Sequence, residues 1–338
     1  MKTLRLHGLR DLRIHEEPAP LPAQGETLLD VSSVGICGSD LHWFAQQGIG
    51  DARLSRPLVL GHEFSAVIAQ GPHTGQRVAV EPAIACGSCE FCQKGHPNLC
   101  ANVIFAGHGT QDGAFREQLA WPSRNLFPLP DSLSADDGAM LEPLGVAIHA
   151  VDLGHIEPGM TVAVFGCGPI GLLIVQLARL CGAARIVATD VLPHRVEAAR
   201  AYGARHAFQS SASPEPDQIL AVTAGRGVDV AFEAAGAQAA VDDAFAAVIP
   251  GGKVILAGIP DDDRTSFSAA VARRKGLTIK LVRRMKHTYP RAIQLVENGM
   301  LDVRSLVTHR FSFENAAQAF EVAAQREGIK VIVTTEAL

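Results

Sequence analysis

The sequence has little that suits a nucleic-acid-binding, secreted or membrane-spanning protein. Among its 338 residues, 30 are basic and 35 acidic, so the net charge of -5 offers no concentrated positive charge for nucleic acid or anionic membranes. The first twenty residues contain no continuous apolar stretch that would resemble a signal peptide. Charged residues make up only 19% and apolar residues 47%, which argues against disorder. We therefore expect a cytoplasmic protein with a large core and, from its length, two domains.

One segment, residues 161–178, is nearly long and apolar enough for a membrane-spanning helix. However, Gly166, Gly168, Pro169 and Gly171 interrupt its middle. A strand, a tight turn and a helix explain this pattern better than a single helix does.

The chain has seven cysteines, an odd number that argues against a disulfide framework and for a reducing compartment. Four of them follow the spacing Cys86-x2-Cys89-x2-Cys92-x7-Cys100. Four thiolates so close together can close a tetrahedral zinc site with no open position, which fits a structural role. A redox Cys-x-x-Cys pair would leave two of these thiols unexplained. A zinc ribbon for nucleic acid is disfavoured by the acidic charge balance.

The organisation of the chain changes near residue 145. The first 145 residues alternate short β-branched runs with turn residues, which predicts an irregular, mostly β domain. Residues 146–285 alternate apolar strands with helices, and this pattern predicts a parallel sheet covered on both faces. The expected strands are 161–165, 185–189, 228–232, 253–257 and 277–281, and the expected helices are 170–180, 193–202, 217–224 and 237–248, with a polar loop at 209–217.

The last segment, residues 286–338, is expected to return to the first domain. The sequence pattern of this segment predicts a helix at 289–297, a short strand, a second helix at 313–326 and a final strand at 330–334.

A dinucleotide site is predicted at the turn Gly166-Cys167-Gly168-Pro169-Ile170-Gly171, which follows a strand and opens a helix. The glycines permit the tight turn, the approach of backbone amides to a pyrophosphate, and helix–strand packing, while the helix N-terminus favours the phosphates. Asp190 ends the next strand, where a carboxylate binds ribose hydroxyls and repels a 2′-phosphate, so NAD is favoured over NADP. The role of Arg195 is more ambiguous.

A second set of metal-ligating residues is dispersed along the chain: Cys37, His62, Glu63 and Glu142. His62-Glu63 does not begin a metalloprotease helix, because position 66 is alanine. Taken singly, Cys37 and His62 would more often be buried core residues. Together with a nicotinamide site, one thiolate, one imidazole and a carboxylate would leave an open position, which is typical of catalytic zinc.

Along nearly its whole length the chain resembles the zinc-dependent medium-chain dehydrogenases. The resemblance is carried, in order, by the Gly-Ile-Cys-Gly-Ser-Asp run at 35–40, Gly-His-Glu at 61–63, the four cysteines, a Leu-Glu-Pro turn at 141–143 and the glycine-rich loop. Within the family it is most similar to the sorbitol, or polyol, dehydrogenase branch. The resemblance implies an α/β protein with a GroES-like, mostly β catalytic domain and a Rossmann doubly wound coenzyme domain.

The resemblance also implies roles for individual residues. Cys37, His62 and Glu63 would bind a catalytic zinc, and Glu142 would either contact the zinc-bound water or exchange with Glu63 as ligand. Ser39 and His42 would form a proton relay, and Asp40 would orient a zinc ligand. The remaining assignments are Ile170, Asp190, Arg195, Ala257, Gly258 and Ile259 to NAD, and Arg284 to substrate.

Two positions depart from the polyol pattern. Trp43 and Met285 stand where that branch has tyrosines, so two hydroxyl groups that would bind substrate hydroxyls are missing. The expected reaction is oxidation of a secondary alcohol by NAD, with two zinc ions per chain, on a polyol or sugar alcohol.

Alternatives within the family are a threonine 3-dehydrogenase-like enzyme and a general zinc alcohol dehydrogenase. A metal-free, quinone-reductase-like member would lack the ligands present here. A zinc-ribbon adaptor that senses NAD would leave the dispersed ligands without purpose. The expected partner is a small alcohol, with no nucleic acid or membrane, and the resemblance implies a homodimer or homotetramer, for which strand 277–281 offers an open sheet edge.

Overall fold

The computed structural model describes residues 1–210 and 215–335, which divide into two compact units. The first unit combines residues 1–143 with 286–338, and the second comprises residues 144–285. The first division therefore falls two residues before the expected position of 145, and the second lies at 285 as expected. Part of the expected loop 209–217 lies outside the described residues.

The first unit is built around a seven-stranded sheet in the order β11-β7-β6-β3-β19-β18, with β10 paired to β3 beside this path. Its strands alternate buried side chains with turn residues, as the sequence predicts for an irregular β domain. The main strands and helices are β3 (Glu26–Gly35), α1 (Gly38–Gln46), β6 (Glu63–Ile68), β7 (Arg77–Val80), β10 (Gln118–Pro122), β11 (Leu126–Pro128), α9 (Tyr289–Glu297), β18 (Val307–Ser312), α10 (Ala316–Gln325) and β19 (Lys330–Thr334).

Smaller elements complete this unit. A separate hairpin of β1 (Lys2–Gly8) and β2 (Asp11–Glu16) contributes Leu4 and Leu6 to the core. The others are β4 (Gly48–Ile49), β5 (Ala52–Arg53), β8 (Ala83–Ile84), α2 (Glu90–Gln93) and β9 (Ile104–Phe105), with 3-10 turns at Pro97–Leu99, Ser123–Asn125 and Phe313–Asn315.

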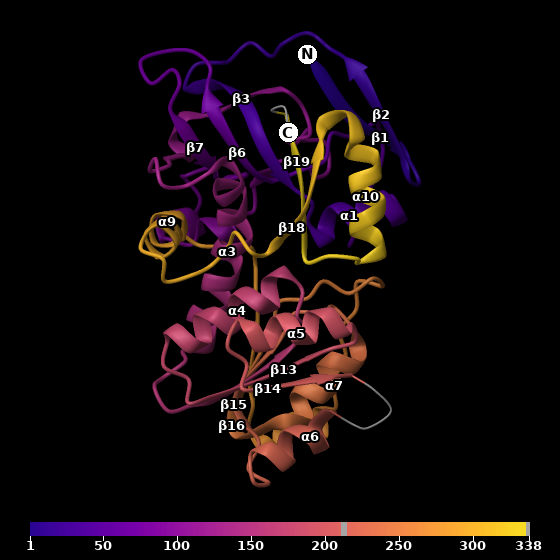
Figure 1. Ribbon diagram of the computed structural model, residues 1–338, viewed down its shortest axis with the longest axis vertical. Helices are drawn as coiled ribbons and strands as arrows, with labels where there is room; N and C mark the ends of the chain where they lie inside the picture. Colours follow the sequence, from indigo (N-terminus) through magenta and orange to yellow (C-terminus); the bar gives the residue numbers. More distant parts are fainter. Residues whose placement is uncertain (211–214, 336–338) are drawn as a thin grey trace. The chain divides into compact units, whose positions relative to one another are not determined.

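The C-terminal segment returns to the first unit and completes its sheet. In Figure 1 the yellow strand β19 lies beside the indigo strand β3. β19 pairs antiparallel with β3, with Ile332 opposite Gly35, and parallel with β18 on its other side. Strand β19 is thus an interior strand of the sheet in the first unit.

The second unit is a six-stranded parallel sheet in the order β14-β13-β12-β15-β16-β17. Figure 1 shows α4 and α5 on one side of this sheet and α6 and α7 on the other, which confirms the predicted doubly wound arrangement. The elements are β12 (Thr161–Phe165), α4 (Pro169–Leu180), β13 (Arg185–Asp190), α5 (Pro193–Ala201), β14 (His206–Gln209), α6 (Glu215–Val222), β15 (Val228–Glu233), α7 (Gln238–Ala247), β16 (Val248–Leu256), α8 (Ala269–Lys275) and β17 (Thr278–Leu281).

The apolar segment 161–178 forms β12, the glycine-rich turn and most of α4, as predicted. Across the described residues, no helix combines the length and apolar character needed to cross a membrane.

Three local expectations were wrong. The Leu-Glu-Pro segment is not a turn but lies inside helix α3 (Ala135–Gly154), which continues through Pro143 because neighbours such as Leu141 and Leu144 are completely buried. Strand β14 was missed, since it lacks an apolar run and pairs only with β13. Strand β16 begins at Val248, five residues before the expected start.

Candidate functional site

Pairing between β3 and β6 brings the dispersed ligands together. Gly35, the last residue of β3, lies opposite Glu63, the first residue of β6. Cys37 follows β3 after one residue and occupies the N-cap of α1. His62 immediately precedes β6, so ligands from two distant segments meet at one end of two adjacent strands.

The side chains of Cys37, His62 and Glu63 form a group that could hold one metal ion. Their ligand atoms, one from each residue, all lie within 4.8 Å of one another. His62 and Glu63 are buried, and Cys37 is half-buried. One thiolate, one imidazole and one carboxylate are donors that zinc accepts, and three protein ligands leave a fourth position open. We call this group the mixed-ligand site.

Glu142 lies outside this group of three but is part of the same electrostatic environment. It is on α3 and is buried. Burial, together with the negative charges of Glu63 and Glu81, raises the pKa of the Glu142 carboxyl to about 8, while His62 and Lys330 oppose the shift. A carboxyl group with such a pKa can hold or release a proton near neutral pH. Whether Glu142 ever replaces Glu63 as ligand stays a prediction.

Asp40 connects the two segments that carry the ligands. One of its carboxylate oxygens accepts a hydrogen bond from the backbone N–H of Gly61 at 3.1 Å and lies 3.5 Å from Nδ1 of His62. The other oxygen accepts the backbone N–H of Cys37 at 3.0 Å. Burial opposes a charged imidazole, but Asp40 and Cys37 raise the pKa of His62 well above its usual value. Asp40 thus lies where an orienting partner for a histidine ligand is expected.

Ser39 and His42 lie on one side of α1, beside the mixed-ligand site. Oγ of Ser39 is 3.3 Å from Nε2 of His62, and His42 follows three residues later, one helical turn away. Both side chains are half-buried, and Nδ1 of His42 lies 3.4 Å from Oε1 of Gln46 on the exposed part of the helix. Transfer of a proton from Ser39 to His42 stays a prediction.

The structure adds a residue that sequence reasoning missed. Lys330 begins β19, and its side chain is only 3% exposed. Its ammonium group lies 2.6 Å from Oε2 of Glu63 and donates to the carbonyl of Ile36 at 3.1 Å. Burial opposes the charge, but Glu63 and Cys37 raise the pKa of Lys330. The only sequence feature that could have indicated this role is the presence of a lysine in a strand predicted to be buried.

The expected substrate residues occupy contrasting environments. Trp43 is 1% exposed, belongs to the core of the first unit, and packs edge-on against the ring of His108 with centroids 5.6 Å apart. Phe105 packs against the ring of His62 at 5.1 Å. In the second unit, Met285 is buried and Arg284 adopts a left-handed backbone conformation. Contact of Trp43, Arg284 and Met285 with substrate stays a prediction.

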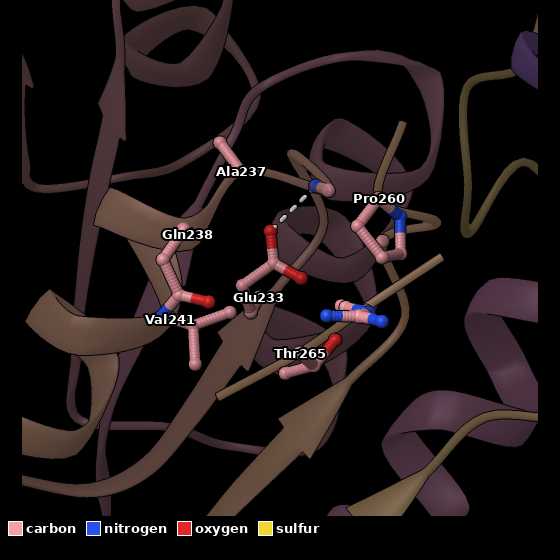
Figure 2. Close-up of a pocket in the computed structure, with 9 residues that line it drawn as sticks. Glu233, Ala237, Gln238, Val241, Pro260 and Thr265 are labelled. Atoms are coloured by element: carbon pink, nitrogen blue, oxygen red, sulfur yellow. Dashed lines mark hydrogen bonds between the residues drawn. The ribbon is translucent and has the colours of Figure 1, made fainter. Parts of the chain in front are cut away.

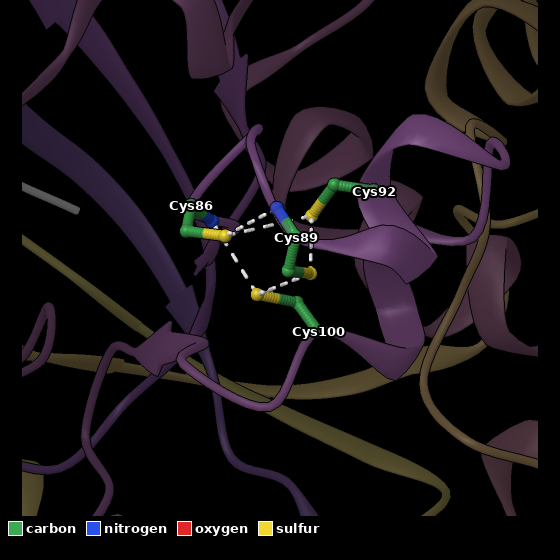
Figure 3. Close-up of side chains that lie close together, drawn as sticks. All are labelled: Cys86, Cys89, Cys92 and Cys100. Atoms are coloured by element: carbon green, nitrogen blue, oxygen red, sulfur yellow. Dashed lines mark hydrogen bonds between the residues drawn. The ribbon is translucent and has the colours of Figure 1, made fainter.

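The four predicted structural ligands converge on one point of the first unit (Figure 3). The sulfur atoms of Cys86, Cys89, Cys92 and Cys100 lie within 4.8 Å of one another. Backbone N–H groups of Ser88 and Cys89 lower the pKa of Cys86 to about 6, whereas burial raises that of Cys92. This arrangement, here called the four-cysteine lobe, has the donor set of a closed tetrahedral zinc site.

The glycine-rich loop of the second unit has the expected geometry. Gly166 has φ of +92°, and a side chain there would collide with Ala235. A side chain at Gly171 would overlap the carbonyl of Gly166, so this glycine permits the helix to pack closely on the strand. Asp190 accepts the backbone N–H of Cys167 at 2.7 Å and of Leu192 at 2.9 Å, which ties the loop to the carboxylate predicted to bind ribose.

A small hollow in the second unit adjoins the expected cofactor turn 257–259 (Figure 2). Its buried Glu233 was not expected from the sequence, and one oxygen of this carboxylate accepts the N–H groups of Ala235 and Gly236, each at 2.7 Å. Gly258 lines the same hollow, and a side chain there would collide with Glu233. The backbone carbonyl of Glu233 accepts the N–H groups of Ala257 at 2.8 Å and Gly258 at 3.1 Å, so Glu233 links the two turns, 234–237 and 257–259.

Two family models match the chain. The model described as alcohol dehydrogenase GroES-like domain matches residues 23–131, and the model described as zinc-binding dehydrogenase matches residues 169–298. Among curated proteins, the sorbitol dehydrogenase of Bacillus subtilis (strain 168) is 38% identical over 98% of this chain and 97% of its own length. A probable D-xylulose reductase A of Arthroderma otae is 36% identical over 97% and 95%.

Solved structures show the same fold over the whole chain. An alcohol dehydrogenase of Escherichia coli CFT073, solved with NADH, matches with a TM-score of 0.91 and 29% identity over 99% of both chains. A zinc-binding dehydrogenase of Sinorhizobium meliloti 1021, solved with NADP, matches with a TM-score of 0.89 and 30% identity over 98% of both chains.

Proposed function

The chain belongs to the zinc-binding dehydrogenase family, and on this basis we propose that it oxidises a secondary hydroxyl group of a polyol or sugar alcohol to a ketone, with NAD as hydride acceptor. The observation that carries the proposal is the mixed-ligand site. It joins Cys37, His62 and Glu63 in a buried environment with the donor set of a catalytic zinc. Relatives named sorbitol dehydrogenase and xylulose reductase support a polyol substrate.

Each residue near this site has a defined task. A zinc ion held there would supply Lewis acidity that lowers the pKa of a substrate hydroxyl. Ser39, next to His62, accepts the hydroxyl proton and passes it to His42 near the surface. Asp40 orients His62, and Glu142, buried on α3 in the electrostatic environment of His62 and Glu63, would contact a zinc-bound water or exchange with Glu63 as ligand.

The cofactor is bound by the second unit. The glycine-rich loop and the N-terminus of α4 would receive the pyrophosphate, and Ile170, Arg195 and the turn 257–259 would line NAD. We propose NAD in preference to NADP, because Asp190 is buried and fixed by two backbone N–H groups. A carboxylate in this position accepts ribose hydroxyls and repels a 2′-phosphate.

A second metal ion would occupy the four-cysteine lobe, which gives two zinc ions per chain. Four thiol ligands leave no open position, so this ion would have a structural role. An odd number of cysteines, four of which gather in the four-cysteine lobe, favours a cytoplasmic, reducing compartment. We also propose a homodimer or homotetramer, since β17 is an edge strand of its sheet and its Leu281 is 71% exposed.

A different substrate within the same family is favoured by one observation. Trp43 and Met285 are both buried and lack the hydroxyl groups that polyol dehydrogenases use to bind substrate hydroxyls. Loss of such groups weakens discrimination for polar substrates. The alternative is therefore a simple secondary alcohol or threonine as substrate.

The test is NAD reduction against sugar alcohols, aldonates, simple secondary alcohols and threonine, each with and without a zinc chelator. We expect chelator-sensitive activity on one group of polyols, with NAD preferred to NADP. Activity confined to threonine or a simple alcohol would establish the alternative. Activity that survives removal of metal from the mixed-ligand site would refute the role of zinc.

A further inference from the structure

Lys330 is placed by the sheet against the mixed-ligand site. It is the first residue of β19, and two residues later Ile332 pairs with Gly35 at the end of β3. The same end of β3 pairs with Glu63. Three strands therefore bring a lysine, a glutamate and the chain leading to Cys37 to one place.

Buried lysines are rare, because an ammonium group loses its hydration and requires a compensating partner. Lys330 is 3% exposed, and it has two partners, the carboxylate of Glu63 and the carbonyl of Ile36. Neither partner is one of the substrate or cofactor residues named above. The position of Lys330 is thus explained by Glu63 and by the short segment that precedes Cys37.

The Glu63 carboxylate is confined from two sides. Lys330 engages Oε2 at 2.6 Å. A side chain at Gly35 would overlap the same oxygen, so the backbone of β3 leaves room for this carboxylate only because position 35 has no Cβ. These contacts fix the position of Oε2.

The number of oxygens that Glu63 offers determines how open the metal site is. A carboxylate can bind through one oxygen or two, and two-oxygen binding would occupy the position required by a substrate hydroxyl. His62 already has an orienting partner in Asp40, which also accepts the N–H of Cys37. Lys330 is the corresponding partner for the carboxylate ligand.

We propose that Lys330 is a positioning residue for the metal site: it retains Oε2 of Glu63, so that Glu63 binds the ion through Oε1 alone and the fourth position stays open. This inference rests on the proposed function only in that a metal occupies the mixed-ligand site. It does not depend on the identity of the substrate.

The experiment measures cobalt(II) binding to protein from which metal has been removed at the mixed-ligand site while zinc is retained in the four-cysteine lobe. Wild type is compared with Lys330→Met, which keeps the length of the side chain without its charge. Lys253→Met is the matched control, because Lys253 also donates to a backbone carbonyl, that of Gly154, but in the second unit. The readouts are the dissociation constant and the visible absorption bands, which report coordination.

We expect Lys330→Met to weaken cobalt binding about 10- to 100-fold, as loss of an outer partner of a ligand does, and to change the absorption bands. Lys253→Met should do neither. Wild-type affinity and bands in Lys330→Met would overturn the proposal. If wild type binds cobalt only in the lobe, both this inference and the proposed metal site fail. A normal cobalt site without dehydrogenase activity would refute only the proposed reaction.

A double-variant cycle keeps the test valid if Lys330→Met alone does not fold with an unpaired Glu63. Glu63→Gln is compared with Glu63→Gln/Lys330→Met, in which no buried charge is left without a partner. If Lys330 acts through Glu63, the second substitution leaves cobalt affinity unchanged. A further loss of about 10-fold or more would show that Lys330 acts by another route and would refute the proposal.

Discussion

The four-cysteine lobe and the mixed-ligand site both gather metal-ligating side chains within 4.8 Å, but the chain builds them differently. The lobe uses one sulfur-only set from a single short segment, and only Cys100 among its ligands is buried. The mixed-ligand site draws its residues from the ends of two strands and depends on a third strand, β19, for Lys330. A local loop is sufficient for a closed site, whereas a site that must keep a position open requires partners from the core.

The sharpest test of this contrast is to remove a ligand from the mixed-ligand site. His62→Ala should lower turnover by about 10³-fold or more, because the activated hydroxyl loses several kcal/mol of stabilisation. NAD binding, measured by fluorescence titration, should be nearly unchanged, since the glycine-rich loop lies in the other unit. His73→Ala, at an exposed position, is the control. Unchanged turnover in His62→Ala would refute the catalytic assignment.

Removal of a ligand from the lobe should affect stability instead. Cys100→Ala leaves three thiols for a closed site, so the lobe loses folding energy supplied by metal. We expect the melting temperature to fall by more than about 5 °C, measured by calorimetry. Activity per folded molecule at low temperature should remain close to wild type. Cys181→Ala, a half-buried thiol outside both sites, should change neither quantity. Loss of turnover at full stability would make the lobe part of the catalytic machinery.

A smaller effect is expected from the backbone beneath Glu63. Gly35→Ala would place a methyl group against Oε2 and displace the carboxylate, so metal affinity at the mixed-ligand site should fall about tenfold. Gly38→Ala is the matched control, because a methyl group there would meet no atom within 4 Å and the residue begins a helix. Metal affinity is measured by competition with a chelator. Equal affinities in both variants would show that the β3 backbone does not confine Glu63.

Much of the second unit could be predicted because its signals are local. β12 has the predicted bounds, and α4, α5 and β13 differ by one residue at one end, since apolar strands alternate with helices and glycine marks the turn. The four-cysteine lobe could be predicted for the same reason. The spacing of its four cysteines along the chain is enough to predict that their sulfur atoms lie close together.

The missed features depend on tertiary context. Lys330 gave no signal, because its partner Glu63 is 267 residues away and the two meet only through β3. The helix through Pro143 was missed because burial outweighs the local cost of proline in that helix. Likewise, Glu233 became visible only through the turns that it joins. Residues that support a site are harder to predict than its ligands. Metal ligands often follow a recognisable spacing in the sequence, whereas a supporting lysine or glutamate follows none.

The interior position of β19 also has a consequence for how the chain folds. During synthesis the second unit emerges complete before the last strand of the first, and its neighbouring strands are mostly close in sequence. The first unit cannot close its sheet until residues 330–334 insert between β3 and β18. Such distant pairing is slow relative to local pairing. The Lys330 ammonium group, which contacts Glu63, therefore reaches the mixed-ligand site after the three ligand residues. The site is completed late in folding.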